Sequence, residues 1–293
     1  MTRIGVVGVP EGWSSLRLVD AVKSKTDFGL LIDMEHVVVD LDAGTAMFGD
    51  VDLCTLDAMI IKKVGVTYSP DLMARLAMLR YIGGRGPKIF SPPANIKRVI
   101  DRLSCTVSLR AADIPMPTTV ITEDLEQAAS AVKRLGKCIL KPLYSTKARG
   151  MIVVEPGPDL MEDLQTFKAN GNVILYLQQM IDLPGKDLGL AFLGGEFCGC
   201  YARVRSAGEW NTTTHSGGKY KAHEASPDII ELARRAQKPF GLDFTCVDVA
   251  ETADGPVVFE VSAFGGFRGL LEANNFDAAD HYAQYVLNQL KAQ

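Results

Sequence analysis

Residues 242–262 read LDFTCVDVAETADGPVVFEVS, two apolar runs separated by the turn-forming sequence Ala253-Asp254-Gly255. Runs of this length around such a turn predict a β-hairpin. If the three turn residues form the loop and Gly255 has a left-handed backbone, Asp248 lies directly opposite Glu260. The two carboxylates then share one face with Cys246, Ala250, Val258 and Ser262. The other face is wholly apolar and carries Val247, Val249, Val257, Phe259 and Val261.

Two carboxylates in directly opposite positions have Cβ atoms roughly 5 Å apart, a distance at which like charges destabilise the sheet. A bridging cation removes that penalty, and hard divalent ions such as Mg²⁺ prefer oxygen ligands. The alternative is a pair of acids on a solvated strand face. The hairpin alone leaves both interpretations of Asp248 and Glu260 open.

A second polar cluster lies in residues 138–151, CILKPLYSTKARGM. Lys141 ends an apolar run that predicts a strand, and buried lysines are rare without an anionic partner. The loop after it contains hydroxyl and cationic side chains, which suit a phosphate-binding loop. A lysine whose ammonium group reaches solvent from a strand end is the structural alternative. Lys62 and Lys63 end another predicted strand, where they either contact an acidic substrate or are simply exposed.

Two further stretches could serve a nucleotide. The strand-like run VILYLQQM at 173–180 offers backbone and amide groups that can read an adenine ring, and Asp187 follows as a candidate for ribose hydroxyls or a solvent-facing acid. Residues 203–221, RVRSAGEWNTTTHSGGKYK, begin with Arg203 and are rich in hydrogen-bond donors. Such a segment suits an anionic, phosphorylated reactant.

Composition excludes several classes of protein. The 293 residues are 47% hydrophobic, which is enough for a large core, and the length predicts two domains. The net charge of −4, without a basic block, argues against nucleic-acid binding. Six scattered cysteines without a CxxC pair indicate free thiols in a reducing compartment. No signal-peptide pattern and no apolar run of about 18 residues occur, so we expect a cytoplasmic protein without a membrane span.

The hydrophobic pattern predicts a small parallel sheet followed by antiparallel sheets. In the first 90 residues, strands at 3–9, 35–42, 57–65 and 88–90 alternate with helices at 14–25 and 70–86, the first with Ser14 or Ser15 as N-cap. Residues 91–99 contain two prolines and read as a linker, followed by a helix. Strands are expected in 137–154, 172–181, 187–204 and 243–262. Helices are expected at 123–136, with Gly136 as its stop, and at 226–241, with Ser226 as N-cap.

Taken together, the ordered clusters resemble the ATP-grasp superfamily, most closely the RimK-like carboxylate–amine ligases, over essentially the whole chain. Three stretches, LKPLYSTKARGM, WNTTT and FEVSAFGGFRGLLE, also resemble the ATP-grasp component of the GAK system. The resemblance implies an α/β chain with three parts. These are a pre-ATP-grasp, Rossmann-like domain at 1–93, a central ATP-grasp subdomain at 94–178 and a C-terminal subdomain with the metal site at 179–293.

The resemblance also implies roles at matching positions. The residues implied to bind ATP are Arg102, Lys141, Ser145, Lys147, Arg149, Gln178, Gln179, Asp187, Asn211 and Thr213. Asp248, Glu260 and Ser262 are the implied ligands of Mg²⁺, with two ions expected and Mn²⁺ as a substitute. Arg203 and Lys141 are implied to act on the transferred phosphoryl group, and Arg268 is expected to hold a substrate carboxylate or the acyl phosphate.

Two positions depart from the family pattern: Ser262 stands where an asparagine ligand is usual, and Gly189 stands where an arginine is usual. The implied activity is ATP-dependent ligation of a small-molecule or peptide carboxylate to an amine such as an amino acid, through an acyl phosphate. A homo-oligomer is compatible with this activity. The alternatives are a small-molecule kinase of the same fold and an ATP-binding scaffold that has lost catalysis.

Overall fold

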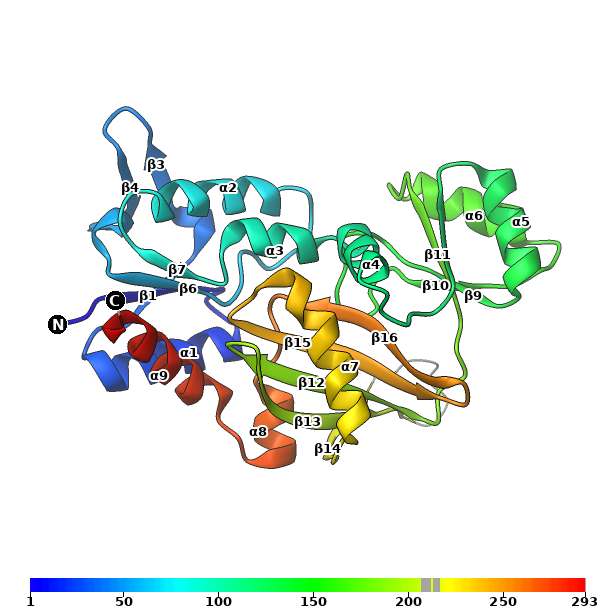
Figure 1. The fold of residues 1–293 in the computed structure, drawn as a ribbon. Helices are drawn as coiled ribbons and strands as arrows, with labels where there is room; N and C mark the ends of the chain where they lie inside the picture. The colour runs from blue at the N-terminus through cyan, green and yellow to red at the C-terminus, as the bar shows by residue number, and fades with distance from the viewer. Residues whose placement is uncertain (207–211, 213–216, 293) are drawn as a thin grey trace.

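The computed structural model describes residues 1–206, 212 and 217–292. The N-terminal region contains the predicted parallel sheet, in the order β2-β1-β6-β7 (Figure 1). Its strands are β1 (Ile4–Val7), β2 (Leu30–Ile32), β6 (Ala58–Ile61) and β7 (Lys88–Phe90). The connecting helices are α1 (Trp13–Thr26) and α2 (Leu72–Gly83). Helix α1 begins two residues before Ser15, so the predicted serine N-cap is wrong and Gly12 holds that position.

Residues 34–55 do not join the parallel sheet, contrary to expectation. They form a short antiparallel sheet of β3 (Val38–Asp40), β4 (Thr45–Phe48) and β5 (Val51–Asp52), flanked by the 3₁₀ turns η1 (Met34–His36) and η2 (Leu53–Thr55). This arm projects from the N-terminal sheet (Figure 1). The strand on the other side of β1 from β6 is instead β2, a three-residue element that the sequence pattern did not reveal.

The predicted linker at 91–99 is largely helical. Helix α3 (Pro93–Ile100) starts with proline at a first-turn position, where the missing N–H costs nothing. Asp101 then leaves helical geometry and caps α4 (Arg102–Ala111), accepting a hydrogen bond from the Ser104 amide at 2.7 Å. The single predicted helix is therefore two helices, and the break places Arg102 at the start of the second.

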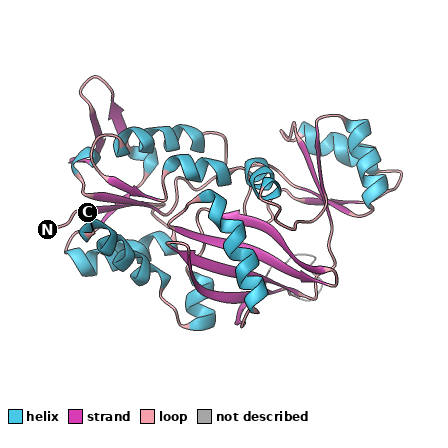
Figure 2. Ribbon diagram, viewed as in Figure 1, coloured by secondary structure: helices cyan, strands magenta, loops and turns pink. Residues whose placement is uncertain are grey.

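The central region is a four-stranded sheet in the order β10-β9-β11-β8, covered by two helices (Figures 1 and 2). The strands are β8 (Thr119–Thr122), β9 (Cys138–Leu140), β10 (Ile152–Val154) and β11 (Leu175–Gln179). The helices are α5 (Leu125–Leu135) and α6 (Leu160–Ala169), which pack on a small apolar core of their own. Helix α5 ends at Gly136, as predicted, with a positive φ of 77°.

The C-terminal region is built on a five-stranded antiparallel sheet in the order β14-β13-β12-β15-β16. Its strands are β12 (Lys186–Leu193), β13 (Glu196–Val204), β14 (Lys219–Ala222), β15 (Phe244–Thr252) and β16 (Gly255–Ser262). Helix α7 (Pro227–Gln237), followed by η4 (Lys238–Phe240), packs its apolar side on one face, and Ser226 caps it as predicted. The opposite face of the sheet carries the candidate site.

The last two helices return the chain to the N-terminal sheet. They are α8 (Arg268–Asn274) and α9 (Ala278–Lys291). Helix α9 packs on α1 through an apolar cluster that includes Leu18, Val22 and Tyr282. None of the helices within the described residues combines the length and the apolar character that a membrane-crossing segment needs.

The β15–β16 hairpin has a shorter loop than predicted, and a β-bulge compensates for it. Thr252 pairs with Gly255, so the loop has two residues and the predicted three-residue loop is wrong. Asp248 nevertheless pairs with Glu260, as predicted, because a β-bulge inserts Phe259 as an extra residue between the two registers. The bulge also exchanges the predicted faces of two residues. Val258 enters the core and Phe259 faces the candidate site.

Candidate active site

A cavity of about 270 Å³ lies between the central sheet and the C-terminal sheet. Polar residues from both sheets and from α4 line it, and they include most of the residues implied by the resemblance. These are Arg102, Lys141, Ser145, Lys147, Gln178, Gln179, Asp187, Arg203, Asp248 and Glu260. Side chains that are far apart in the sequence therefore converge on one space.

Lys141 follows β9 directly and is almost fully buried. Its Nζ donates a hydrogen bond to Gln178 Oε1 at 2.5 Å and lies 5.6 Å from the centre of the Phe259 ring. Burial and the neighbouring Arg102 lower the pKa of Lys141 to about 7, with Glu260 acting in the opposite direction. A bound anion would favour the charged form, so Lys141 is poised to gain from phosphate groups.

Gln178 orients this lysine. Its amide nitrogen donates to Thr119 Oγ1 at 3.1 Å and to the Tyr176 hydroxyl at 3.3 Å, while its oxygen accepts from Lys141. The expected role of the Gln178 side chain at adenine is therefore not what this geometry favours, since its polar atoms are already engaged. The Gln179 side chain also turns aside, because its Nε2 donates to the Leu135 carbonyl at 3.4 Å.

Arg203, on β13, joins two acids on neighbouring strands. It is bonded to both carboxylate oxygens of Asp187 and lies 2.9 Å from Asp248 Oδ2. Burial is the main cause that raises the pKa of Asp248 to about 7; Glu260 and Asp187 raise it further, and Arg203 lowers it. The ribose-binding role expected of Asp187 would require this buried ion pair to rearrange.

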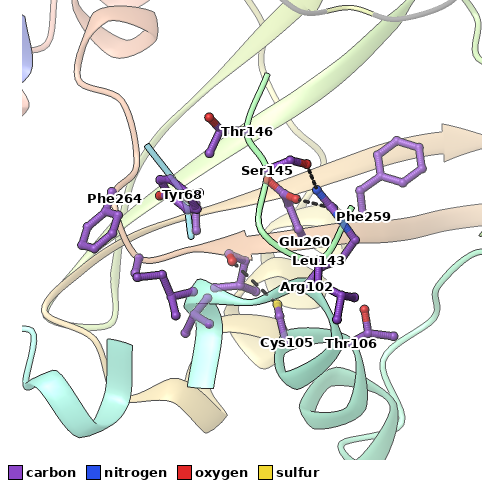
Figure 3. A pocket seen from close by; sticks show the side chains of 15 residues that line it. Tyr68, Arg102, Cys105, Thr106, Leu143, Ser145, Thr146, Phe259, Glu260 and Phe264 are labelled. Carbon is purple, nitrogen blue, oxygen red and sulfur yellow. Dashed lines mark hydrogen bonds and ion pairs between the residues drawn. The ribbon is translucent and has the colours of Figure 1, made fainter. Parts of the chain in front are cut away.

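Glu260 has an equivalent partner in Arg102, the first residue of α4. Arg102 Nη1 lies 3.0 Å from Glu260 Oε2, and Nη2 lies 3.4 Å from Ser145 Oγ (Figure 3). Its Nε donates to the Pro142 carbonyl at 3.2 Å. Arg102 thus links α4, the loop between β9 and β10 and the β16 carboxylate. Each of the two carboxylates expected as metal ligands forms an ion pair with an arginine.

The paired carboxylates fit a divalent metal ion in their chemistry. Asp248 and Glu260 are cross-strand partners that both face the cavity, and carboxylate oxygens are preferred by Mg²⁺. No group of three His, Cys, Asp or Glu side chains suited to a metal occurs among the described residues. The remaining ligands would therefore come from phosphate oxygens and water, as is usual for Mg²⁺ at nucleotide sites.

Ser262, the third expected metal ligand, lies beside this cavity rather than in it. It lines a smaller cavity of about 50 Å³ that shares Arg102, Ser145 and Glu260 with the larger one (Figure 3). Tyr68 from the N-terminal region also lines the smaller cavity. Burial and, secondarily, Glu260 raise the pKa of Tyr68, so its hydroxyl stays protonated and can donate a hydrogen bond.

The loop between β9 and β10 covers one side of the larger cavity. Lys147 and Ala148 both have a left-handed backbone, with φ of 58° and 56°. Such strain in non-glycine residues is concentrated at functional segments. Lys147 lines the cavity, whereas Arg149 bonds to Thr146 in its own loop and does not line it.

Apolar side chains also line the cavity. They are Ile139, Met151, Met180, Ile181, Leu183 and Phe259. A lining that combines apolar and cationic side chains suits a nucleotide, whose base is flat and weakly polar and whose phosphates are charged. Sequence reasoning missed Phe259, because only the β-bulge turns it toward the cavity.

Arg268 is a further expected site residue that is not brought to this cavity. It begins α8, lies 5.1 Å over the Trp13 ring and 3.6 Å from Glu272 Oε1, and does not line either cavity. Asn211 and Thr213 lie outside the described residues. Thr212, between them, is buried and lines the cavity, although the sequence pattern did not single it out.

The comparisons with known proteins agree with this architecture. The family model described as a RimK-like ATP-grasp domain matches residues 99–286. Tetrahydromethanopterin:alpha-L-glutamate ligase of Methanosarcina acetivorans is 24% identical, over 99% of this chain and 100% of the relative.

Solved structures support the same fold. The RimK domain ATP-grasp protein of Sphaerobacter thermophilus has a TM-score of 0.76 at 21% identity, covering 97% of this chain and 99% of the other. The ATP-grasp ligase PsnB, in complex with a minimal precursor, Mg and ADP, has a TM-score of 0.73 at 20% identity, covering 98% and 97%. The match over most of the described fold, together with the converging cationic and acidic residues, shows that this chain belongs to the RimK-like ATP-grasp family.

Proposed function

We propose that this protein is an ATP- and Mg²⁺-dependent ligase that joins a carboxylate to an amine through an acyl phosphate. The single observation that carries the proposal is the cavity between the two antiparallel sheets. It brings Lys141 and Arg203 together with the paired carboxylates Asp248 and Glu260, and apolar side chains line the same cavity.

The chemistry follows from these groups. A carboxylate oxygen of the acid attacks the γ-phosphorus of ATP, the bond to the β-phosphate oxygen breaks, and ADP leaves. The amine nitrogen then attacks the acyl carbon, phosphate leaves, and the amine proton passes to solvent or phosphate. Phosphoryl transfer depends on positioning and charge neutralisation rather than on a covalent residue. Lys141, Arg203 and Arg102 supply cations, and no protein nucleophile is required.

The two arginines lie beside the carboxylates that would hold the metal: Arg102 pairs with Glu260, and Arg203 pairs with Asp248. Asp248 and Glu260 would hold Mg²⁺, which when bound would supply positive charge to the phosphate oxygens. The two arginines would then be free to contact the anionic reactants. We propose two ions, with Ser262 acting on a bound water rather than as a direct ligand, and Mn²⁺ as a substitute.

The loop that contains Ser145 and Lys147 is placed to close over the phosphates and exclude water from the acyl phosphate. An amino acid is the proposed amine, because the relative described above is named a glutamate ligase. Free cysteines throughout the chain are consistent with a reducing, cytoplasmic compartment.

The proposal is tested by incubating the full-length protein with Mg·ATP and a small-molecule cell extract, then following ADP, phosphate and new masses. Ligation predicts equal release of ADP and phosphate together with a product whose mass equals acid plus amine minus water. Isotopic ¹⁸O in the acid carboxylate should appear in the released phosphate, because that oxygen attacks phosphorus.

Two alternatives give other results. A small-molecule kinase releases ADP without phosphate and leaves a stable phosphorylated product when amines are removed from the extract. A scaffold without catalysis binds Mg·ATP in calorimetry and turns over nothing, even with the whole extract. Either result would contradict the ligase proposal.

A further inference from the structure

The smaller cavity meets the larger one at the Arg102–Glu260 ion pair. Both residues line both cavities, as do Ser145, Thr146 and Phe259. Its other walls come from α3, α4, the end of β16 and the N-terminal region (Figure 3). The larger cavity already offers the cationic and apolar side chains that ATP needs. The smaller cavity is therefore additional space beside a carboxylate expected to hold the metal.

Within the described part of the chain, one cation lines the smaller cavity. It is Arg102, which is paired with Glu260. Lys147 lines only the larger cavity, and Lys63, which is half-buried, lines neither. Apolar side chains make up much of the remaining wall, and they include Val99, Ile100, Leu143, Ala263 and Phe264. A buried charge without a partner is costly, so this cavity suits one anionic group at most.

Hydroxyl groups supply the other polar contacts of the wall. They belong to Tyr68, Thr106, Ser145, Thr146 and Ser262. Those of Tyr68 and Ser262 form no hydrogen bond with the described residues, whereas the other three bond to neighbouring side chains. Ser262 is proposed to act on a metal-bound water. The Tyr68 hydroxyl, which burial keeps protonated by raising its pKa, is then the donor that remains for a substrate.

The N-terminal region holds this part of the wall in place. The Tyr68 ring packs edge-on against Phe264, with ring centres 6.3 Å apart (Figure 3). At the next residue, the Gly265 carbonyl accepts a hydrogen bond from Lys62 Nζ at 2.5 Å. Lys62 is buried, so the exposure considered for it from the sequence is wrong. The segment after β6 therefore contacts the turn after β16 at two points, which fixes Tyr68 beside the cavity.

The volume of the cavity limits the size of its ligand. An engineered cavity of about 150 Å³ is large enough to bind benzene. The smaller cavity has a volume of about 50 Å³. It therefore admits a carboxylate with a short aliphatic group, but no aromatic ring.

We propose that the smaller cavity binds the acid substrate, and that this substrate is a short aliphatic acid with a single negative charge. Its carboxylate accepts hydrogen bonds from the Tyr68 hydroxyl and from Arg102, which is released from Glu260 once Glu260 holds the metal. Its aliphatic part packs against Leu143 and Ala263. The carboxylate then lies where the two cavities meet, next to the phosphates of ATP in the larger one. This inference rests on the proposed ligase function and specifies its acid.

The test measures binding without turnover. The full-length protein is saturated with Mg·AMPPNP, Mg²⁺ is kept in excess, and acids are titrated at neutral pH by ligand-detected NMR. Isovalerate and malonate are the matched probes, because they share one skeleton of non-hydrogen atoms and malonate has a second carboxylate in place of the isopropyl group. Benzoate carries one charge on a ring. We expect isovalerate to bind about tenfold more tightly than either of the others.

Two variants locate the binding. Tyr68→Phe removes the hydroxyl and keeps the ring, so it should weaken isovalerate binding about tenfold and leave the affinity for Mg·AMPPNP unchanged. Tyr81→Phe on α2 is the matched control, since Tyr81 lines neither cavity. Ala263→Val narrows the smaller cavity alone and should abolish isovalerate binding. Normal binding of Mg·AMPPNP shows that this variant is folded, and Tyr68→Phe carries the test if it is not.

Two results would overturn the inference. One is binding of malonate or benzoate as tightly as isovalerate, and the other is unchanged affinity for isovalerate in Tyr68→Phe. Neither result depends on turnover. A protein that binds isovalerate as expected but never ligates would retain the acid site and lose the proposed function. Ligation of a dicarboxylic or aromatic acid without binding of isovalerate would refute the inference and leave the ligase function intact.

Discussion

Arg203 on β13 bridges Asp187 on β12 and Asp248 on β15, so that one guanidinium pairs with two buried acids from different strands. Arg102 forms a second ion pair, with Glu260. Two arginines therefore serve three carboxylates, and a change at any one of these residues alters the charge of the whole site.

The variant Arg203→Met should destabilise the protein, because it leaves Asp187 and Asp248 buried without their cation. Removing one partner of a buried ion pair costs about 3–5 kcal/mol. Urea unfolding of this variant beside Arg134→Met, an exposed arginine on α5 without an ion pair, measures the difference. Equal stability of the two variants would show that the bridge contributes nothing.

The variants Asp248→Asn and Glu260→Gln should each abolish Mg²⁺-dependent ATP turnover while the protein stays folded. Each change replaces one of the two carboxylates that face the cavity by a neutral amide. Glu251→Gln is the matched control on the same hairpin, since Glu251 lies 3.0 Å from Lys186 and outside the cavity. Near-normal ADP release by both site variants would refute the metal assignment.

ATP binding should take up protons at neutral to alkaline pH through Lys141. Burial and Arg102 lower its pKa to about 7 in the free protein, whereas phosphate groups favour the ammonium form. Lys141 is thus largely neutral above pH 7 in the free protein and gains a proton when ATP binds. ATP affinity therefore falls as the pH rises from about 7 toward the higher pKa that Lys141 has in the complex. Calorimetry at pH 8 in buffers of different ionisation enthalpy measures this uptake, and Lys141→Met should remove it and weaken binding.

The variant Gly189→Ala should destabilise the protein through Tyr201. A Cβ atom at position 189 would lie 2.5 Å from Tyr201 Cζ, closer than real Cβ contacts. Overpacking of this kind typically costs about 1–3 kcal/mol. In a double-mutant cycle, Tyr201→Ala should remove most of the penalty of Gly189→Ala; strictly additive effects would contradict this steric explanation. The same close approach of Tyr201 gives a steric reason for glycine rather than arginine at position 189.

Much of the architecture follows from local sequence patterns. Three of the four strands expected in the first 90 residues form the parallel sheet, as β1, β6 and β7. The Ser226 cap of α7 and the Gly136 end of α5 are also confirmed, because each depends on residues close together in the chain. Lys141 and the Asp248–Glu260 pair were also recognised, since a charged residue inside an apolar run stands out. The three-part domain division remains a prediction.

Other features could not be predicted in this way. The β-bulge at Phe259 compensates for a shorter loop, and nothing in the alternating pattern of β16 signals it. The break between α3 and α4 at Asp101 lies within an apparently continuous apolar stripe. Arg268 was expected near the phosphates, but it begins α8, which packs against β13 and β14, and its guanidinium lies over the Trp13 ring instead.

The linear order of residues was therefore sufficient for the family, the fold class and most of the polar residues that line the cavity. Which charges pair with one another was decided only in three dimensions: Arg102 with Glu260, and Arg203 with Asp187 and Asp248. Local structure follows from the types and spacing of residues that are close together in the chain. Electrostatic partners depend instead on distances between segments that only long-range packing brings together.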